Sequence, residues 1–243
     1  MPHAIRIHQT GGPEVLCWEA VDLPAPAPGE ATVRHHAVGL NYIDTYHRTG
    51  LYPLPLPSGI GLEGAGVVEA VGEGVTEVKV GDRVAYAGGP IGAYAEVRNI
   101  PAHRLLILPD SIGFDTGAAM MLQGLTAAYL LRKTYRVQPG DAVLIHAAAG
   151  GVGLIACQWA KALGATVIGT VGSPAKAELA RAHGCDHVIN YASENFTQRV
   201  RDITGGKGVA VVYDGVDVHH RQAMVLSECT DCGFLQQFAI LPE

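Results

Sequence analysis

Asp141-Ala-Val-Leu-Ile-His-Ala-Ala-Ala-Gly-Gly-Val-Gly-Leu-Ile-Ala156 decides the fold of this chain. An apolar run ends in a glycine-dense turn, and an amphipathic segment, Leu154 to Leu163, follows at once. Within the turn and helix start, 151–156 fits the dinucleotide fingerprint G-x-G-x-x-G/A. Glycines let a backbone approach a pyrophosphate, and a helix start offers free N–H groups to it. The candidate cofactor-binding residues here are Gly150, Gly151, Val152 and Gly153.

The composition narrows the class of protein. The 243 residues carry a formal net charge of −6 and are 48% hydrophobic, which is enough apolar material for one large or two modest domains. The acidic balance argues against a nucleic-acid partner, which usually needs a basic face. No signal-peptide pattern or membrane-length apolar run is seen in the sequence, and its five cysteines are scattered and odd in number. We therefore expect a reduced, cytoplasmic protein without a membrane span.

Short strands separated by turn residues dominate the first half of the sequence. Alternating apolar and polar residues predict strands at 31–37, 66–71 and 83–86. Many short strands with Gly/Pro turns are typical of a small, partly open β-barrel. The pattern changes near residue 120, and Thr116–Thr134 is predicted to be a helix leading into the second half. We place one domain at 1–120 and another at 121–243.

The second half alternates strands and helices. The predicted strands are Ala142–His146, Thr166–Thr170, His187–Asn190 and Val209–Tyr213. The predicted helices between them are Val152–Leu163, Pro174–His183 and Glu194–Thr204. Alternation of this kind gives an α/β fold with a Rossmann-type doubly wound parallel sheet. A complete sheet of this type has six strands. Gly233–Phe238 is predicted to be a fifth, so the sheet is expected to be incomplete at its C-terminal end.

The end of the second predicted strand bears on the choice of cofactor. An NAD enzyme usually places an acidic residue about 20 positions after the first fingerprint glycine, where it binds the ribose 2′-OH. The corresponding segment, Val171–Lys176, contains no acid. Ser173 can donate a hydrogen bond and Lys176 carries a positive charge, which favours the 2′-phosphate of NADPH. In the alternative interpretation, Ser173 only caps a helix and Lys176 is a solvated surface charge.

Several motifs together identify a family resemblance that covers about residues 4 to 216. They are Asn41-Tyr-Ile-Asp44-Thr-Tyr46, Gly61-Leu-Glu63-Gly-Ala-Gly66, Gly81-Asp-Arg-Val84 and Ala147-Ala-Ala-Gly-Gly-Val-Gly153. In combination they resemble the medium-chain dehydrogenase/reductase superfamily, and within it the quinone oxidoreductase branch that includes zeta-crystallin. The resemblance implies a GroES-like substrate domain at 1–120 and an NADP-binding domain at 121–243.

The resemblance also implies a reductase that works without zinc. The zinc alcohol dehydrogenases of the superfamily have a cysteine ligand near position 41 and a Gly-His-Glu motif. Asn41 and Leu62 occupy these places here, and neither supplies the thiolate or imidazole that zinc requires. No closely spaced four-cysteine loop for a structural zinc is present in the sequence.

By resemblance, Asn41, Tyr46 and Thr126 surround the nicotinamide and the pocket, and Tyr52 lines the substrate entrance. A tyrosine hydroxyl can hydrogen-bond a quinone oxygen on which negative charge develops, so Tyr46 and Tyr52 are the candidate catalytic residues. Packing in a loop is an equal alternative for both. Tyr191 matches a family position near the adenosine phosphate, and its alternative is a simple aromatic at a strand end.

The resemblance ends at Val216. The run from Asp217 to Cys232 departs from the family, and we expect either a truncation or a change of reading frame. The lost part would carry the sixth strand and the dimer edge, so the homodimer of the family is doubtful for this chain. A rival hypothesis for this run is a metal site of Cys-x-x-Cys plus paired histidines, made by His219, His220, Cys229 and Cys232.

These expectations leave three functions open. The first is an NADPH-dependent quinone reductase that transfers hydride or electrons to a small quinone. The second is an enoyl or alkenal reductase of the same superfamily, because the same hydride chemistry serves conjugated carbonyls. The third is a catalytically inactive nucleotide-binding fragment. Binding of NADPH with and without turnover separates the third from the others.

Overall fold

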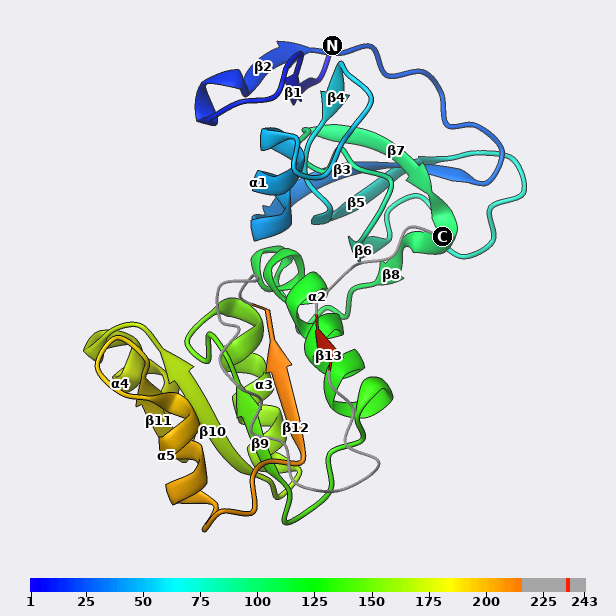
Figure 1. Ribbon diagram of the computed structural model, residues 1–243. Helices are drawn as coiled ribbons and strands as arrows, with labels where there is room; N and C mark the ends of the chain where they lie inside the picture. Colours follow the sequence, from blue (N-terminus) through cyan, green and yellow to red (C-terminus); the bar gives the residue numbers. More distant parts are fainter. Residues whose placement is uncertain (216–234, 237–243) are drawn as a thin grey trace. The chain divides into compact units, whose positions relative to one another are not determined.

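The computed structural model describes residues 1–215 and 235–236. The chain forms two compact units, Met1–Leu122 and Gln123–Glu243, and the boundary between them lies inside helix α2 (Phe114–Tyr129) (Figure 1). Each unit has its own sheets and its own apolar core.

The first unit is built from antiparallel strands, as predicted for a GroES-like β-domain. Its three-stranded sheet has the order β2 (Cys17–Ala20), β1 (His3–Ile7), β4 (Ser58–Gly59). Its five-stranded sheet has the order β7 (Val97–Pro101), β3 (Glu30–Gly39), β5 (Glu63–Val71), β6 (Arg83–Ala87), β8 (Leu106–Ile107). Helix α1 (Tyr42–Thr49) and two 3₁₀ turns, Pro13–Val15 and Ala102–Arg104, complete its elements.

The larger sheet of the first unit buries side chains on both of its faces. One core cluster includes Val33, Val68, Val84, Tyr86 and Ile100. The second includes Ala65 and Ala85 from the sheet, with Ala118 and Met121 from the first half of α2. Side chains alternate between the two faces of a strand, so β5 and β6 supply residues to both clusters.

The first strand is held by residues far along the sequence. The N–H of Ile5 donates to the carbonyl of Tyr94 at 2.7 Å, and the N–H of Glu96 donates to the carbonyl of His3 at 2.9 Å. The side of β1 that faces away from β2 is therefore completed in part by the segment that precedes β7.

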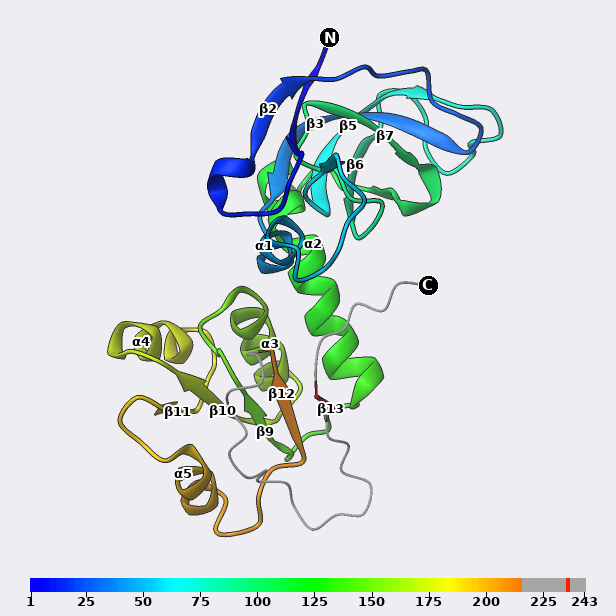
Figure 2. The ribbon, with the colours of Figure 1, turned by 45° about the horizontal axis from the view of Figure 1, so that its top comes forward.

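The second unit is a parallel sheet with helices between its strands, which confirms the predicted Rossmann-type fold (Figure 2). The strand order is β11 (His187–Asn190), β10 (Thr166–Val171), β9 (Ala142–Ile145), β12 (Val211–Asp214), β13 (Leu235–Gln236). The helices are α3 (Gly151–Ala162), α4 (Pro174–Ala182) and α5 (Phe196–Ile203), and a π-helical turn, Leu130–Thr134, follows α2.

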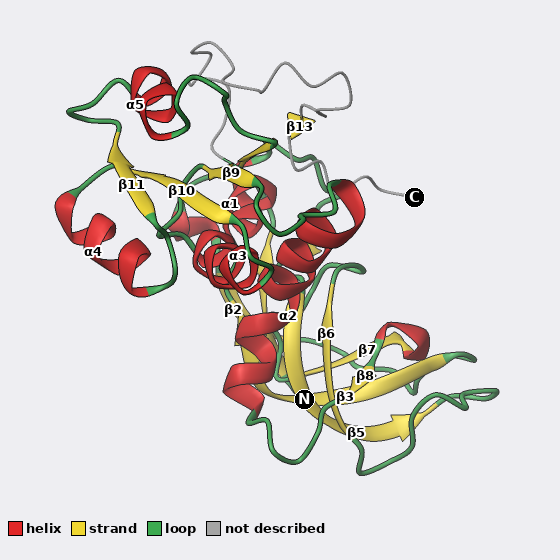
Figure 3. Cartoon of the chain, turned by 90° about the horizontal axis from the view of Figure 1, so that it is seen from below, coloured by secondary structure: helices red, strands yellow, loops and turns green. Residues whose placement is uncertain are grey.

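Helices cover both faces of the parallel sheet (Figure 3). Val143 and Ile145 face a cluster with residues of α3 and α4. Leu144 between them faces a second cluster with Phe196 and Val200 of α5. Strands buried on both faces read as continuous apolar runs in sequence, which explains why 142–145 carries no polar side chain.

The structure extends or corrects several of the predicted elements. Asn41–Tyr46 was not predicted to be helical, but α1 begins at Tyr42. The fingerprint helix begins at Gly151, one residue before the prediction, and β9 ends at Ile145, so His146 lies in the turn. Residues 235–236 of the predicted fifth strand pair in parallel with β12, and the rest of 233–238 lies outside the described residues. Among the described residues, no helix is long and apolar enough to cross a membrane.

Candidate functional site

The glycine turn after β9 is closed by direct backbone contact. A Cβ added to Gly153 would lie 2.3 Å from the carbonyl oxygen of Ala147 and 2.9 Å from the Cα of Ala148. Ala147 itself adopts a positive φ of 50°. Because a real Cβ does not approach backbone so closely, only glycine fits at 153 without moving the turn. The turn therefore presents bare backbone at the start of α3.

Gly151 packs against a side chain that the sequence did not point to. A Cβ at Gly151 would lie 2.3 Å from the Oε1 of Gln123 on α2. The side-chain amide of Gln123 therefore packs against the first turn of α3, beside the free N–H groups of the helix start. The two residues are 28 positions apart and belong to no common motif, so no local sequence signal could have linked them.

The ends of β10 and β11 bring three candidate residues together. Val171 and Asn190 are register partners, so the loops that follow them start side by side. Ser173 is the N-cap of α4, and its Oγ accepts from the N–H of Lys176 at 3.4 Å. The hydroxyl of Tyr191 lies within 2.5 Å of the position that a Cβ on Gly172 would take.

The polar groups at this strand end suit a phosphate. Ser173 accepts with its oxygen, so its O–H proton stays available to a ligand. Lys176 is exposed on the first turn of α4, and Tyr191 is 43% exposed. No acidic residue lies in 171–176, so nothing in this segment repels an anion.

In the first unit, Asn41 is held by a buried carboxylate. The side chain of Asn41 donates from Nδ2 to Oε2 of Glu63 at 2.6 Å, and the N–H of Leu122 donates to Oε1 at 2.8 Å. Glu63 is only 1% exposed, and this burial raises the pKa of its carboxyl, while the bonds from Asn41, Leu122 and the backbone of Met121 oppose the rise. Glu63 thus fixes the Asn41 amide, and a role for Asn41 beside a nicotinamide stays a prediction.

A second buried carboxylate follows on α1. Asp44 accepts at Oδ2 from the hydroxyl of Tyr94 at 2.7 Å and from the N–H of Asn41 at 3.0 Å. Its Oδ1 and the Nδ1 of His47 are buried without a hydrogen-bond partner. Burial raises the pKa of Asp44 and lowers that of His47. Sequence reasoning missed His47 and Tyr94, although the i, i+3 spacing of Asp44 and His47 on a helix would have paired them.

Replacing Asp44 with asparagine is expected to stabilise the first unit at neutral pH by about 1 kcal/mol. The amide oxygen keeps both hydrogen bonds, and a neutral NH2 group replaces the unpartnered, charged carboxylate oxygen. A carboxyl whose folded pKa lies above its unfolded value of about 3.9 binds its proton more tightly when folded, so wild-type stability falls as pH rises between the two values. Urea unfolding measured across this pH range should show a smaller fall in the unfolding free energy for the variant than for the wild type. Asp82→Asn is the control, since Asp82 lies in a loop and accepts from the N–H of Lys79; an equal flattening there contradicts the prediction.

Three tyrosines, two of them on α1, have their rings in contact. The rings of Tyr42 and Tyr46 meet edge to face with centroids 5.3 Å apart, and those of Tyr46 and Tyr52 are also 5.3 Å apart. Tyr52 is 37% exposed and its ring lies 6.0 Å from that of His47. The two predicted catalytic tyrosines are therefore neighbours, and Tyr46 lies on a helix, whereas loop packing was its predicted alternative.

The remaining cofactor candidates belong to the second unit. Thr126 is half-buried on α2, Val152 is half-buried in the first turn of α3, and Gly150 is the N-cap of α3. The N–H of Gly150 donates to the carbonyl of Ala147 at 2.8 Å, which tightens the turn. Their contact with a cofactor stays a prediction.

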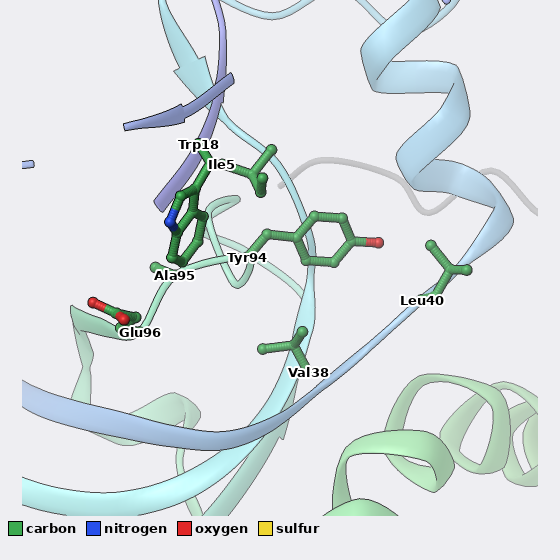
Figure 4. Close-up of a pocket in the computed structure, with 7 residues that line it drawn as sticks. All are labelled: Ile5, Trp18, Val38, Leu40, Tyr94, Ala95 and Glu96. Carbon is green, nitrogen blue, oxygen red and sulfur yellow. The ribbon is translucent and has the colours of Figure 1, made fainter. Parts of the chain in front are cut away.

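An apolar pocket of about 350 Å³ lies in the first unit (Figure 4). Its lining comes from β1, β2, the end of β3 and the segment before β7: Ile5, Trp18, Val38, Leu40, Tyr94, Ala95 and Glu96. Tyr94 lines it with its ring and donates to Asp44 with its hydroxyl. The pocket is thus joined to the buried polar network by one side chain.

The residues in the expected zinc positions do not fit that metal. The amide of Asn41 is bound to Glu63, and Leu62 is buried and apolar. Among the described residues, no group of three or more His, Cys, Asp or Glu side chains could hold a metal ion. The rival metal site at His219, His220, Cys229 and Cys232 lies outside the described residues.

Comparison with known proteins agrees with this geometry. Residues 27–110 match the alcohol dehydrogenase GroES-like domain, and residues 151–242 match the zinc-binding dehydrogenase domain. The chain is 57% identical to a quinone oxidoreductase of Pseudomonas aeruginosa over 217 residues, which cover 89% of this chain and 67% of that protein. It is 51% identical to a 2-haloacrylate reductase of Burkholderia, with 89% and 67% covered.

Solved structures give the same result. A quinone oxidoreductase of Escherichia coli complexed with NADPH superposes with a TM-score of 0.88 at 54% identity, covering 89% of this chain and 67% of that one. The quinone oxidoreductase of Pseudomonas syringae gives the same TM-score at 57% identity, with 90% and 67% covered. The chain spans about two thirds of the length of these relatives.

The fold and the glycine turn define a two-domain nucleotide-binding dehydrogenase. The chain belongs to the quinone oxidoreductase family of the medium-chain dehydrogenase/reductase superfamily.

Proposed function

We propose that this chain binds NADPH on its second unit and reduces a small quinone without zinc. The observation that carries the proposal is the bare-backbone turn at Gly151–Gly153, followed at the end of β10 by Ser173 and Lys176 with no acidic residue. Backbone N–H groups at a helix start bind a pyrophosphate, and a hydroxyl with a lysine binds a 2′-phosphate.

When bound, NADPH supplies the hydride, and the protein supplies orientation and polarity. The start of α3 holds the pyrophosphate, and Ser173, Lys176 and Tyr191 hold the adenosine end. Tyr46 and Tyr52 donate hydrogen bonds to the quinone oxygen, where negative charge develops as hydride arrives. Thr126 of the second unit would orient the nicotinamide, and a role for Asn41, whose amide is held by Glu63, stays what the resemblance implies.

Relatives support both the cofactor and the substrate. Several proteins more than 50% identical to this chain are named quinone oxidoreductases, and the Escherichia coli structure is a complex with NADPH. The lack of thiolate or imidazole ligands at positions 41 and 62 supports a reaction without zinc.

A second function is favoured by one relative. The 2-haloacrylate reductase of Burkholderia is 51% identical to this chain, and an acrylate is a conjugated carbonyl compound. Reduction of an alkenal or enoyl substrate uses the same hydride, so relative rates with a quinone and an acrylate decide between the two. Because the chain spans about two thirds of its relatives, a non-catalytic nucleotide-binding role is the third candidate.

The test is a fluorescence titration of the purified chain with NADPH, followed by addition of a small quinone. Oxidation of NADPH that depends on the chain and saturates with quinone supports the proposal. Binding without turnover assigns the non-catalytic role, and absence of binding rejects all three functions.

Lys176→Ala is expected to raise the Kd for NADPH about tenfold and to leave the Kd for NADH unchanged. The reason is that only NADPH carries the 2′-phosphate that the ammonium group attracts. Arg181→Ala is the matched control, since Arg181 is an exposed cation on the same helix that pairs with Glu178. An equal loss for both cofactors in Lys176→Ala would show that the variant damages the fold and not phosphate recognition.

We further propose that the chain acts in the cytoplasm on a small molecule and not on nucleic acid. Its net charge of −6 and the free thiols of Cys17, Cys157 and Cys185 support this. A homodimer, which the resemblance implies for the family, stays a prediction for this chain.

A further inference from the structure

Two buried cysteines lie beneath the glycine turn. Cys157 is in the middle of α3 and is fully buried, and Cys185 precedes β11 and is 5% exposed. Both belong to the core cluster that covers one face of the parallel sheet. They are 28 positions apart, and the sequence alone gave no reason to pair them.

Two contacts hold the segment with Cys185 against α3, and a third holds it against β10. A Cβ at Gly184 would lie 3.5 Å from the carbonyl oxygen of Cys157, so the two backbones are in close contact. Lys161, one turn after Cys157, pairs with Asp186. The second oxygen of Asp186 accepts from the N–H of Val167 at 2.9 Å. Gly184 and Asp186, which flank Cys185, are thus held in place by contacts with α3 and β10.

The thiol of Cys185 lies over a strand residue that has no side chain. Cys157 and Cys185 are neighbours in the core cluster, and each thiol shifts the pKa of the other. A Cβ at Gly169 of β10 would lie 2.6 Å from the Sγ of Cys185 and 2.5 Å from the Cβ of Ala148, so this space is filled by the thiol and the turn. The Sγ of Cys157 also donates to the carbonyl of Ala148 at 3.9 Å.

We propose that Cys157 and Cys185 form a reversible oxidation site through which hydrogen peroxide weakens nucleotide binding. The sulfur of Cys185 attacks one peroxide oxygen, which gives a sulfenic acid and water. The sulfur of Cys157 then attacks the sulfur of Cys185 and displaces the sulfenic oxygen as water, so that the S–S bond forms. Two thiols and one peroxide thus give one disulfide and two waters, and an added dithiol reverses the change.

The order of the two steps follows from the asymmetry of the pair. The neighbouring thiol of Cys157 lowers the pKa of Cys185, and the neighbouring Cys185 together with burial raises the pKa of Cys157. Thiolate character decides which cysteine reacts first, so Cys185 is the attacking residue and Cys157 the resolving one. Cys185 is also the more exposed of the two.

Oxidation reaches the nucleotide turn through Ala148. In the reduced state Cys157 donates its S–H to the carbonyl of Ala148. Gly153 packs against the backbone of this same residue. A disulfide has no S–H, so this bond is lost and the sulfur of Cys157 is drawn toward Cys185. The turn loses one of its supports, and we expect NADPH to bind about tenfold more weakly.

The experiment uses the full chain with Cys17, Cys229 and Cys232 replaced by serine, so that only the pair remains. Protein treated with peroxide is alkylated, digested without reductant and mapped by mass spectrometry. We expect one cross-linked peptide pair that lacks two hydrogens and disappears with dithiothreitol. Cys185→Ala in the same background is the control and should show no cross-link and no effect of peroxide on binding.

Two outcomes overturn the inference. Peroxide that leaves both thiols free, or that converts Cys185 to a sulfinic acid without a cross-link, rejects the pair. A cross-link that changes neither NADPH affinity nor amide hydrogen exchange in Ala147–Gly153 rejects the coupling to the turn. The exchange measurement needs no cofactor, so failure of the proposed NADPH binding leaves this test intact.

Discussion

Gly153→Ala is expected to abolish most NADPH binding, with a rise in Kd of about 100-fold, and to lower the unfolding free energy of the second unit by about 3 kcal/mol. The added methyl would lie 2.3 Å from the carbonyl oxygen of Ala147 and 2.9 Å from the Cα of Ala148. Both neighbours are backbone atoms of the turn, so relief requires the turn to move and its N–H groups to leave their positions. Fluorescence titration and thermal unfolding measure the two effects.

Gly124→Ala is the matched control for this change. Gly124 lies on α2, and nothing lies within 4 Å of a Cβ added there. Alanine in a helix interior is favoured over glycine by roughly 0.5–1 kcal/mol, so the control should be as stable as the wild type or more so. If Gly153→Ala matched this control in stability and in affinity for NADPH, the backbone of the turn could move to accept a methyl group, and the prediction would be wrong.

Glu63→Ala is expected to lower the unfolding free energy of the first unit by about 4 kcal/mol. The change leaves the Nδ2 of Asn41 without its buried acceptor, and it opens a cavity where the side chain was. Urea unfolding followed by the fluorescence of Trp18, with Trp159 replaced by phenylalanine, reports on this unit.

Glu69→Ala is the control, because Glu69 lies on the same strand but pairs with Arg34 at the surface. A surface pair contributes at most about 1 kcal/mol. Equal losses for the two glutamates would contradict the structural role assigned to Glu63. A loss confined to Glu63→Ala, together with a change in the pH dependence of unfolding, would support it.

The second unit could be predicted from sequence because its signals are local. The apolar strand 142–145, the glycine turn and the helix after it are contiguous, and Ser173 with Pro174 marks the start of α4. The bounds differ by a residue or two, as at Asn195, the N-cap of α5, where the prediction began the helix at Glu194. Each of these features is decided by residues within one turn or strand.

The first unit was harder because its polar contacts join distant residues. Helix α1 is short and rich in aromatic and β-branched residues, which are weak helix formers. Its signals were Asn41 with Asp44 three residues later, and Gly50 in the left-handed region at the C-cap. The bond from Asn41 to Glu63 and that from Tyr94 to Asp44 span 22 and 50 residues, and no local pattern reveals them.

The long-range closure of the first strand has a consequence for synthesis on the ribosome. The backbone groups of His3 and Ile5 that face away from β2 receive their partners only when Tyr94 and Glu96 have left the exit tunnel. Nascent chain up to that point exposes an unpaired strand edge, which invites association with other chains. In the second unit, by contrast, β10 and β11 pair with strands made about 20 residues apart. The nascent first unit is therefore where a holding chaperone has the longest interval in which to act.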